Sequence, residues 1–193
     1  RALRGRPLAA NTGGNAVFCT IEHEDTSSLW RVDLMDLSVR EVATFDGPPP
    51  LSGAVTPDEQ WFVCGVYPVR DNICRLDRIH LPSGRTDVLC ELADISAHMQ
   101  FDPAGSGQTI VQINRGRRPS TNTARGSLTG PLGATLVVAD VEACRVETLP
   151  VGRPHTPRIS GHECWAGRTG RILFTAGQYD VTTSSYVTLK DPP

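Results

Sequence analysis

The sequence of 193 residues lacks several features that would assign a protein to a class at once. It has no apolar run near the roughly 20 residues of a membrane-spanning helix, so we expect no membrane span. It has a single lysine, Lys190, and a formal net charge of −2, which argue against a nucleic-acid or anionic-membrane binder. None of its six cysteines forms a CxxC pair, which argues against zinc-ribbon and thioredoxin chemistry.

Common catalytic signatures are also missing. There is no GxSxG, no P-loop and no HExxH, so no hydrolase nucleophile, nucleotide cradle or zinc-protease helix is indicated. The first residues, Arg1 to Arg6, contain neither an initiator methionine nor an apolar signal region, and we expect a segment of a longer protein. Cys19 and Cys64 lie inside apolar runs at like positions. We interpret them as free thiols, which favours a reducing, cytoplasmic compartment.

Short apolar runs dominate the chain, and none has the period of an amphipathic helix. Runs rich in Val, Ile, Thr, Phe and Trp alternate with Gly, Pro, Asp and Asn turns, as is typical of strands. Val17, Phe62 and Ile110 occupy like positions, 45 and 48 residues apart, which matches the ~40–50 residues of a four-stranded propeller blade. We therefore predict an all-β fold, a β-propeller of four-stranded antiparallel blades, with a β-sandwich as the alternative.

The repeat divides residues 1–193, one domain, into units at about 8–50, 51–96, 97–160 and 161–193. The third unit carries a long insertion, Asn114 to Gly133. Because propellers have four to eight blades, three full units and part of a fourth would not comfortably close a ring. We expect the chain to be a segment of a larger propeller.

Basic side chains recur at one end of the predicted blades. In a meandering blade, the entry to the innermost strand and the loop between the second and third strands lie at the same end. This places His98 and His162, at two successive strand entries, beside Arg70, Arg115 and Arg117 at one mouth of the central channel. Imidazoles and guanidiniums there suit an anionic ligand or a metal. Each histidine alone could instead be a hydrogen-bonded structural residue, and the insertion a flexible surface loop.

Two runs resemble the blade-entry motifs of oligogalacturonate lyases, within the wider TolB-like and WD40-like propeller group. They are His98-Met99-Gln100-Phe101-Asp102-Pro103 and Gly161-His162-Glu163-Cys164-Trp165, the second followed by Arg171-Ile172-Leu173-Phe174. The resemblance covers mainly residues 50–176. It implies a seven-bladed propeller that cleaves short oligogalacturonides by β-elimination with a divalent metal, typically Mn²⁺.

The resemblance also implies roles for single residues. His98 matches the catalytic histidine and His162 one metal ligand, while Arg70 is our assignment for the catalytic arginine, with Arg75 as the alternative. The family's remaining metal ligands, a glutamine and two histidines, have no matching motif here, so we expect an incomplete metal site. The residues that we expect to bind a small acidic oligosaccharide are Arg115, Arg117 and Gln100.

Two other functions remain open from the sequence. One is a non-catalytic TolB-like propeller that binds a protein or carbohydrate at the channel mouth. The other is a peptidase-associated propeller, for which no nucleophile is visible. Imidazoles of His98 and His162 that open toward the channel would favour the lyase, and imidazoles packed between blades would favour a binding module.

Overall fold

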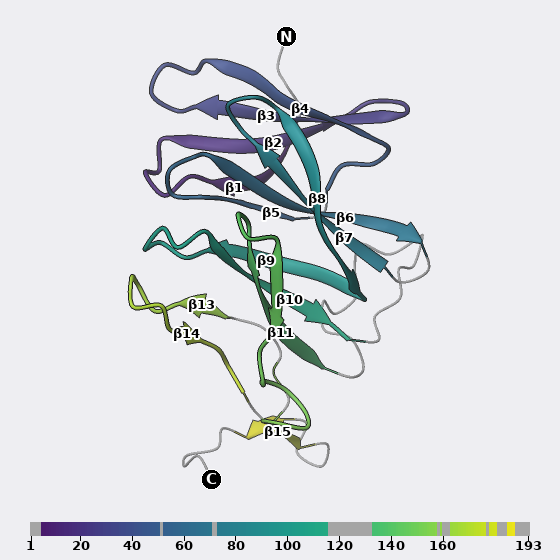
Figure 1. Cartoon of the computed structure of the whole chain (residues 1–193), viewed down its shortest axis with the longest axis vertical. Coiled ribbons are helices and arrows are strands. Elements are labelled where there is room, and N and C mark those ends of the chain that lie inside the picture. Colours follow the sequence, from purple (N-terminus) through teal and green to yellow (C-terminus); the bar gives the residue numbers. More distant parts are fainter. Residues whose placement is uncertain are drawn as a thin grey trace.

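The computed structural model describes residues 5–50, 52–70, 73–115, 133–157, 159, 163–176, 178–180 and 185–187. All sixteen regular elements there are β-strands, which confirms the predicted all-β class. Three four-stranded antiparallel sheets follow one another along the chain, and two two-stranded sheets come after them. Figure 1 shows these sheets stacked in chain order between the two termini. In the described part, no helix is long and apolar enough to cross a membrane.

Each four-stranded sheet is a propeller blade in which consecutive strands pair antiparallel. Blade 1 contains β1 (Arg6–Ala10), β2 (Ala16–Glu22), β3 (Thr26–Asp33) and β4 (Val39–Asp46). Blade 2 contains β5 (Gly53–Val55), β6 (Trp61–Arg70), β7 (Ile73–His80) and β8 (Arg85–Ala93). Blade 3 contains β9 (Ile95–Phe101), β10 (Gln108–Asn114), β11 (Ala134–Asp140) and β12 (Arg145–Thr148). The fourth unit is described as β13 (Cys164–Trp165), β14 (Ile172–Leu173), β15 (Gln178–Asp180) and β16 (Ser185–Val187).

The antiparallel order fixes which connections share an end of the blades. The loops from β2 to β3, β6 to β7 and β10 to β11 lie at one end, which we call the mouth end. The tight turns from β1 to β2, β5 to β6 and β9 to β10 lie at the other end, which we call the turn end. The topology therefore places the insertion at the mouth end and the Pro57-Asp58 and Asp102-Pro103 turns at the turn end.

The core lies between blades, because the second strands of blades 2 and 3 are buried on both faces, whereas β2 of blade 1 alternates between buried and half-buried residues. Phe62 on β6 packs against Phe18 of blade 1, with ring centroids 5.3 Å apart. Its neighbour Val63 points the other way and joins a cluster with Met99 and Val111 of blade 3. A strand that is apolar on both faces has no side to present to water, so each blade needs a neighbour on either side.

An arginine on the third strand of a blade reaches the next blade at the turn end. Arg31 of β3 pairs in register with Phe18 and donates to the Glu59 carboxylate in the β5–β6 turn, with an Nε–Oε2 distance of 2.8 Å. Arg78 of β7 pairs in register with Val63, lies 5.0 Å from the Trp61 ring centroid and donates to the Val141 carbonyl at 2.5 Å. We call Arg31 and Arg78 the inter-blade arginines.

The six cysteines are free thiols. The interpretation of Cys64 as a buried thiol is confirmed, whereas Cys19 is half-buried. Burial raises the pKa of Cys64 well above its ordinary value and that of Cys90 to about 12. Because the thiolate is the reactive form, these two thiols are held in an inert state.

Alkylation should therefore separate the cysteines into two groups. We expect iodoacetamide at about pH 8 to label the exposed Cys144 and Cys164 of the native protein and to spare Cys64 and Cys90. Peptide mass spectrometry before and after unfolding in urea measures this. Rapid labelling of Cys64 in the native protein would contradict the burial of this thiol between blades 1 and 2.

Replacing Arg78 with alanine should weaken the contact between blades 2 and 3. The change removes a charged hydrogen bond to the Val141 carbonyl and a cation–π contact with Trp61. We expect the free energy of unfolding in urea to fall by about 2 kcal/mol. Arg85→Ala is the matched control, since the Arg85 side chain is 65% exposed and should cost no more than about 0.5 kcal/mol. Equal losses for both variants would contradict the role of Arg78 as an inter-blade arginine that stabilises the contact between blades 2 and 3.

Candidate functional site

A hollow of about 280 Å³ lies where the innermost strands of the three blades meet. Backbone and side chains of β1, β5 and β9 form its wall, so it borders the axis around which the blades are arranged. Most residues of the wall are apolar by type, and Gln100 and Thr12 are its polar side chains among Leu8, Ala9, Ala10, Gly53, Ala54, Val55, Met99 and Phe101, but polar atoms make up the larger part of its exposed surface. A ligand in the hollow would therefore meet polar atoms as well as apolar side chains.

His98 lies on β9, the innermost strand of blade 3. This strand begins at Ile95, so His98 is in its middle rather than at its entry as predicted. The pairing with β10 shifts here: Gln100 lies opposite Ile110, and Ala97 lies opposite Gln112. His98 and Met99 together therefore face the single residue between Ile110 and Gln112, which makes a β-bulge.

The bulge turns the two residues to different surroundings. His98 has a φ of 53°, in the left-handed region that few non-glycine residues adopt, and its side chain is 41% exposed. Met99 is 6% exposed and packs in the core between blades 2 and 3. The bulge thus frees an imidazole from the sheet while it keeps the strand anchored, and such re-aimed side chains are common beside functional sites.

Glu163 is the residue that faces His98 from the fourth unit. Its side chain is only 1% exposed, and its Oε1 lies 3.8 Å from Nδ1 of His98. The Gln100 side chain donates from Nε2 to the Glu163 carbonyl at 2.8 Å. Trp165 returns a bond from its indole Nε1 to the Gln100 carbonyl at 2.9 Å. These two bonds join β9 to β13 beside the hollow.

The face of blade 3 that turns toward the fourth unit carries two buried amides on its second strand. Gln112 and Asn114 alternate with Val111 and Ile113, which point into the core between blades 2 and 3. Both amides are buried, and Gln112 donates from Nε2 to Asn114 Oδ1 at 2.6 Å. Ile110 lies opposite Gln100 of β9 as Val63 lies opposite Ala54 of β5, so it takes the position of Phe18 and Val63, and it pairs with Val138. The apolar side chain is therefore repeated in blade 3, whereas the inter-blade arginine is not.

The arginines assigned from the sequence are spread along the mouth end. Arg115 directly follows β10 and donates from Nη1 to the Arg153 carbonyl at 2.8 Å. Arg70 ends β6, and its side chain lies outside the described residues. Arg75 grips the buried Asp77 carboxylate with two bonds of 2.6 and 2.7 Å, so this alternative is already engaged. That pairing raises the pKa of Arg75.

His162 and Arg117 lie outside the described residues. The predicted pairing of His98 with a second imidazole therefore stays a prediction. What the structure brings together is His98, Gln100, Glu163 and Trp165, with Gln112 and Asn114 on the same face of blade 3 as Gln100.

Comparison with solved structures gives the fold a wider context. TolB from Acinetobacter baumannii is similar over 90% of this chain and 41% of its own, with 16% identity and a TM-score of 0.52. The Pyrococcus horikoshii acylaminoacyl peptidase is similar over 92% of this chain and 29% of its own, with 13% identity and a TM-score of 0.60. An oligogalacturonate lyase in complex with manganese is similar over 95% of this chain and 52% of its own, with 15% identity and a TM-score of 0.53.

The chain has a TolB-like β-propeller fold. It spans about half or less of the length of these three propeller proteins. No family model matches the sequence, and no curated protein matches it either.

Sequence reasoning on this propeller missed Glu163 and the two amides of blade 3. The sequence indicated Glu163 only as part of the motif from Gly161 to Trp165, in which His162 was the predicted functional residue. Gln112 and Asn114 had a visible signal: two amides two residues apart in an otherwise apolar strand, on one face of it. A buried strand with polar residues on only one face indicates a polar partner on that side.

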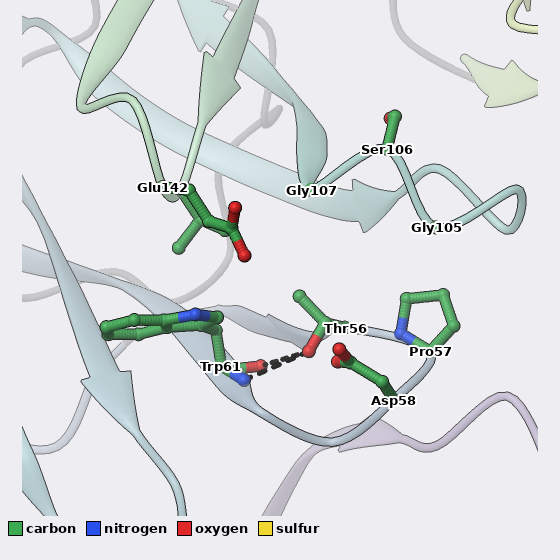
Figure 2. A pocket seen from close by; sticks show the side chains of 9 residues that line it. Thr56, Pro57, Asp58, Trp61, Gly105, Ser106, Gly107 and Glu142 are labelled. Carbon is green, nitrogen blue, oxygen red and sulfur yellow. Dashed lines mark hydrogen bonds between the residues drawn. The ribbon is translucent and has the colours of Figure 1, made fainter.

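A second hollow, of about 170 Å³, lies at the turn end between blades 2 and 3 (Figure 2). Thr56 closes the β5–β6 turn by bonding the Trp61 backbone, and its hydrogen bond lowers the pKa of Asp58. Glu142 faces these residues from the β11–β12 turn in Figure 2. The bonds of Thr56 and Asp58 serve the turn itself.

Replacing Gln112 with leucine tests the polar face of blade 3. The Gln112 Oε1 atom is buried with no hydrogen-bond donor among the described residues, which carries a desolvation cost of about 1–3 kcal/mol. Leucine removes this desolvation cost, although Oδ1 of Asn114 loses the hydrogen bond that Gln112 Nε2 donates to it. We expect the free energy of unfolding in urea to stay within about 1 kcal/mol of the parent value or to rise. A larger fall would show that the amide oxygen is satisfied in solution.

Proposed function

We propose that this propeller acts on short oligogalacturonides as a polysaccharide lyase that works by β-elimination. The observation that supports it most is the exposed His98 imidazole, raised by a bulge on the innermost strand and faced by the buried Glu163 carboxylate. An exposed histidine whose strand neighbours, Met99 and Gln100, line an axial hollow is suited to general-base chemistry. The likeness to a manganese-bound oligogalacturonate lyase adds to it, as a likeness of fold.

The proposed reaction needs one base and one group that holds the uronate carboxylate. Nε2 of His98 would take the proton from C5 of the uronate. The C5–H electron pair then forms the C4–C5 double bond, the C4–O bond breaks, and the leaving oxygen takes a proton from solvent. Arg115 at the mouth end would pair with the carboxylate and stabilise the charge that develops on it. Gln100, in the wall of the hollow, would bond sugar hydroxyls.

The proposed reaction scheme does not include a metal ion. Among the described residues, no three side chains of His, Cys, Asp or Glu come close enough together to hold an ion. His98 and Glu163 alone do not provide the ligand set of a divalent cation. We therefore derive no step through a metal, and manganese, with His162 as a ligand, remains a proposal.

The second candidate is a propeller that binds a carbohydrate or protein at its mouth without cleaving it. The incomplete donor set favours it, because β-elimination beside a uronate carboxylate needs strong charge stabilisation. The polar and apolar atoms of the hollow's wall, with Gln100 as a polar side chain, would serve binding as well as catalysis.

A lyase assay separates the two candidates. Digalacturonate and trigalacturonate are incubated with the protein, with and without Mn²⁺. The unsaturated uronate is followed by its ultraviolet absorbance, and a carbonyl assay detects its rearranged keto product. We expect turnover in the parent protein and a loss of at least about 100-fold in His98→Ala, as for removal of a general base.

The matched control is His80→Gln. His80 lies at the turn end, bonded through Nδ1 to Ser83, and should leave turnover unchanged. Calorimetric titration with trigalacturonate completes the design. Binding without product would favour the binding module, and neither binding nor product would remove both candidates for this sugar.

A further inference from the structure

Glu163 has surroundings that a structural acidic residue rarely has. Its carboxylate is almost wholly buried, yet it faces an imidazole that is 41% exposed, with 3.8 Å between Oε1 and Nδ1 of His98. Buried carboxylates are kept where they have a specific partner, because burying the charge is costly. The two ring nitrogens of His98 are therefore in different environments, with Nδ1 toward the carboxylate.

Two hydrogen bonds from side chains to backbone carbonyls hold both sides of this contact in place. Gln100, two residues after His98, bonds the Glu163 carbonyl at 2.8 Å, and Trp165, two residues after Glu163, bonds the Gln100 carbonyl at 2.9 Å. The reciprocal pair fixes the register of β13 against β9. The bulge then fixes the backbone of His98 in the left-handed region, which is retained only where its surroundings hold it.

We propose that Glu163 is a positioning residue that holds the His98 imidazole in the tautomer with its proton on Nδ1. The 3.8 Å between these atoms is longer than a hydrogen bond, so the preference is electrostatic: an N–H directed at a carboxylate is favoured over a lone pair directed at it, and the lone pair is left on Nε2. The same carboxylate–histidine arrangement orients bases and metal ligands in unrelated enzymes. The importance of this tautomer for catalysis rests on the proposed lyase function, whereas the tautomer itself does not.

The test reads the tautomer directly. Protein with ¹⁵N-labelled histidine is studied by long-range ¹H–¹⁵N correlation at about pH 8, where an ordinary imidazole is neutral. His98 is assigned by comparison with His98→Gln. We expect a protonated-type Nδ1 signal and an unprotonated-type Nε2 signal in the parent protein. A parent His98 with its proton on Nε2 overturns the proposal without the need for any Glu163 variant.

Variants then ask whether Glu163 is the cause. Glu163→Gln should move the His98 signals toward the Nε2-protonated tautomer, and Glu163→Asp should retain part of the parent pattern. Asp77→Asn is the matched control, because Asp77 is also a buried carboxylate but pairs with Arg75 in blade 2. The His80 resonances serve as an internal reference in every sample. Unchanged His98 signals in folded Glu163→Gln overturn the proposal.

Kinetics distinguish this result from a failure of the proposed function. If the parent protein has lyase activity, Glu163→Gln should lower kcat by about 10–100-fold with little change in KM. A rise in KM alone, with kcat unchanged, counts against a positioning role. If the parent protein has no lyase activity, the proposed function fails, and the tautomer measurement still decides the role of Glu163.

Discussion

The packing of one blade's sheet against the next is the interaction on which the rest of the structure depends. A blade of this chain is apolar on both faces of its second strand, as Phe62 and Val63 show by entering different clusters. No single blade can bury both faces by itself, so its stability is a property of neighbouring pairs. The inter-blade arginines strengthen two of these seams by crossing from one blade to the next at the turn end.

The contact between blade 3 and the fourth unit is built differently, and the candidate site lies there. Gln112 and Asn114 are buried amides on the face of β10 that turns toward the fourth unit, Val138 stands where blades 1 and 2 have an inter-blade arginine, and Glu163 is buried beside β9. Polar groups buried in this way fix directions as well as contacts when they are paired. The contact with the fourth unit therefore holds directional groups beside the axial hollow, as functional sites commonly do.

The fold was accessible from the sequence because it depends on local alternation and on spacing. The runs around Val17, Phe62 and Ile110 predicted strands at blade-like intervals, and these lie on β2, β6 and β10. The position of His98 within its strand was predicted less well. A bulge depends on the pairing of two strands, and its left-handed residue is histidine rather than glycine, so no turn residue marked it. The contact between His98 and Glu163 joins two blades and has no local signature.

The same reasoning explains why similarity of fold decides so little about function here. A TolB-like propeller provides repeated blades and an axial hollow, and proteins of different activity share these. What differs between them must lie in side chains at the seams and at the mouth. In this chain those side chains are an exposed imidazole on a bulge, a buried carboxylate that faces it, and two buried amides in blade 3. A left-handed residue that is not glycine is retained only where its surroundings hold it, so the bulge at His98, rather than the fold, is the argument for a site here.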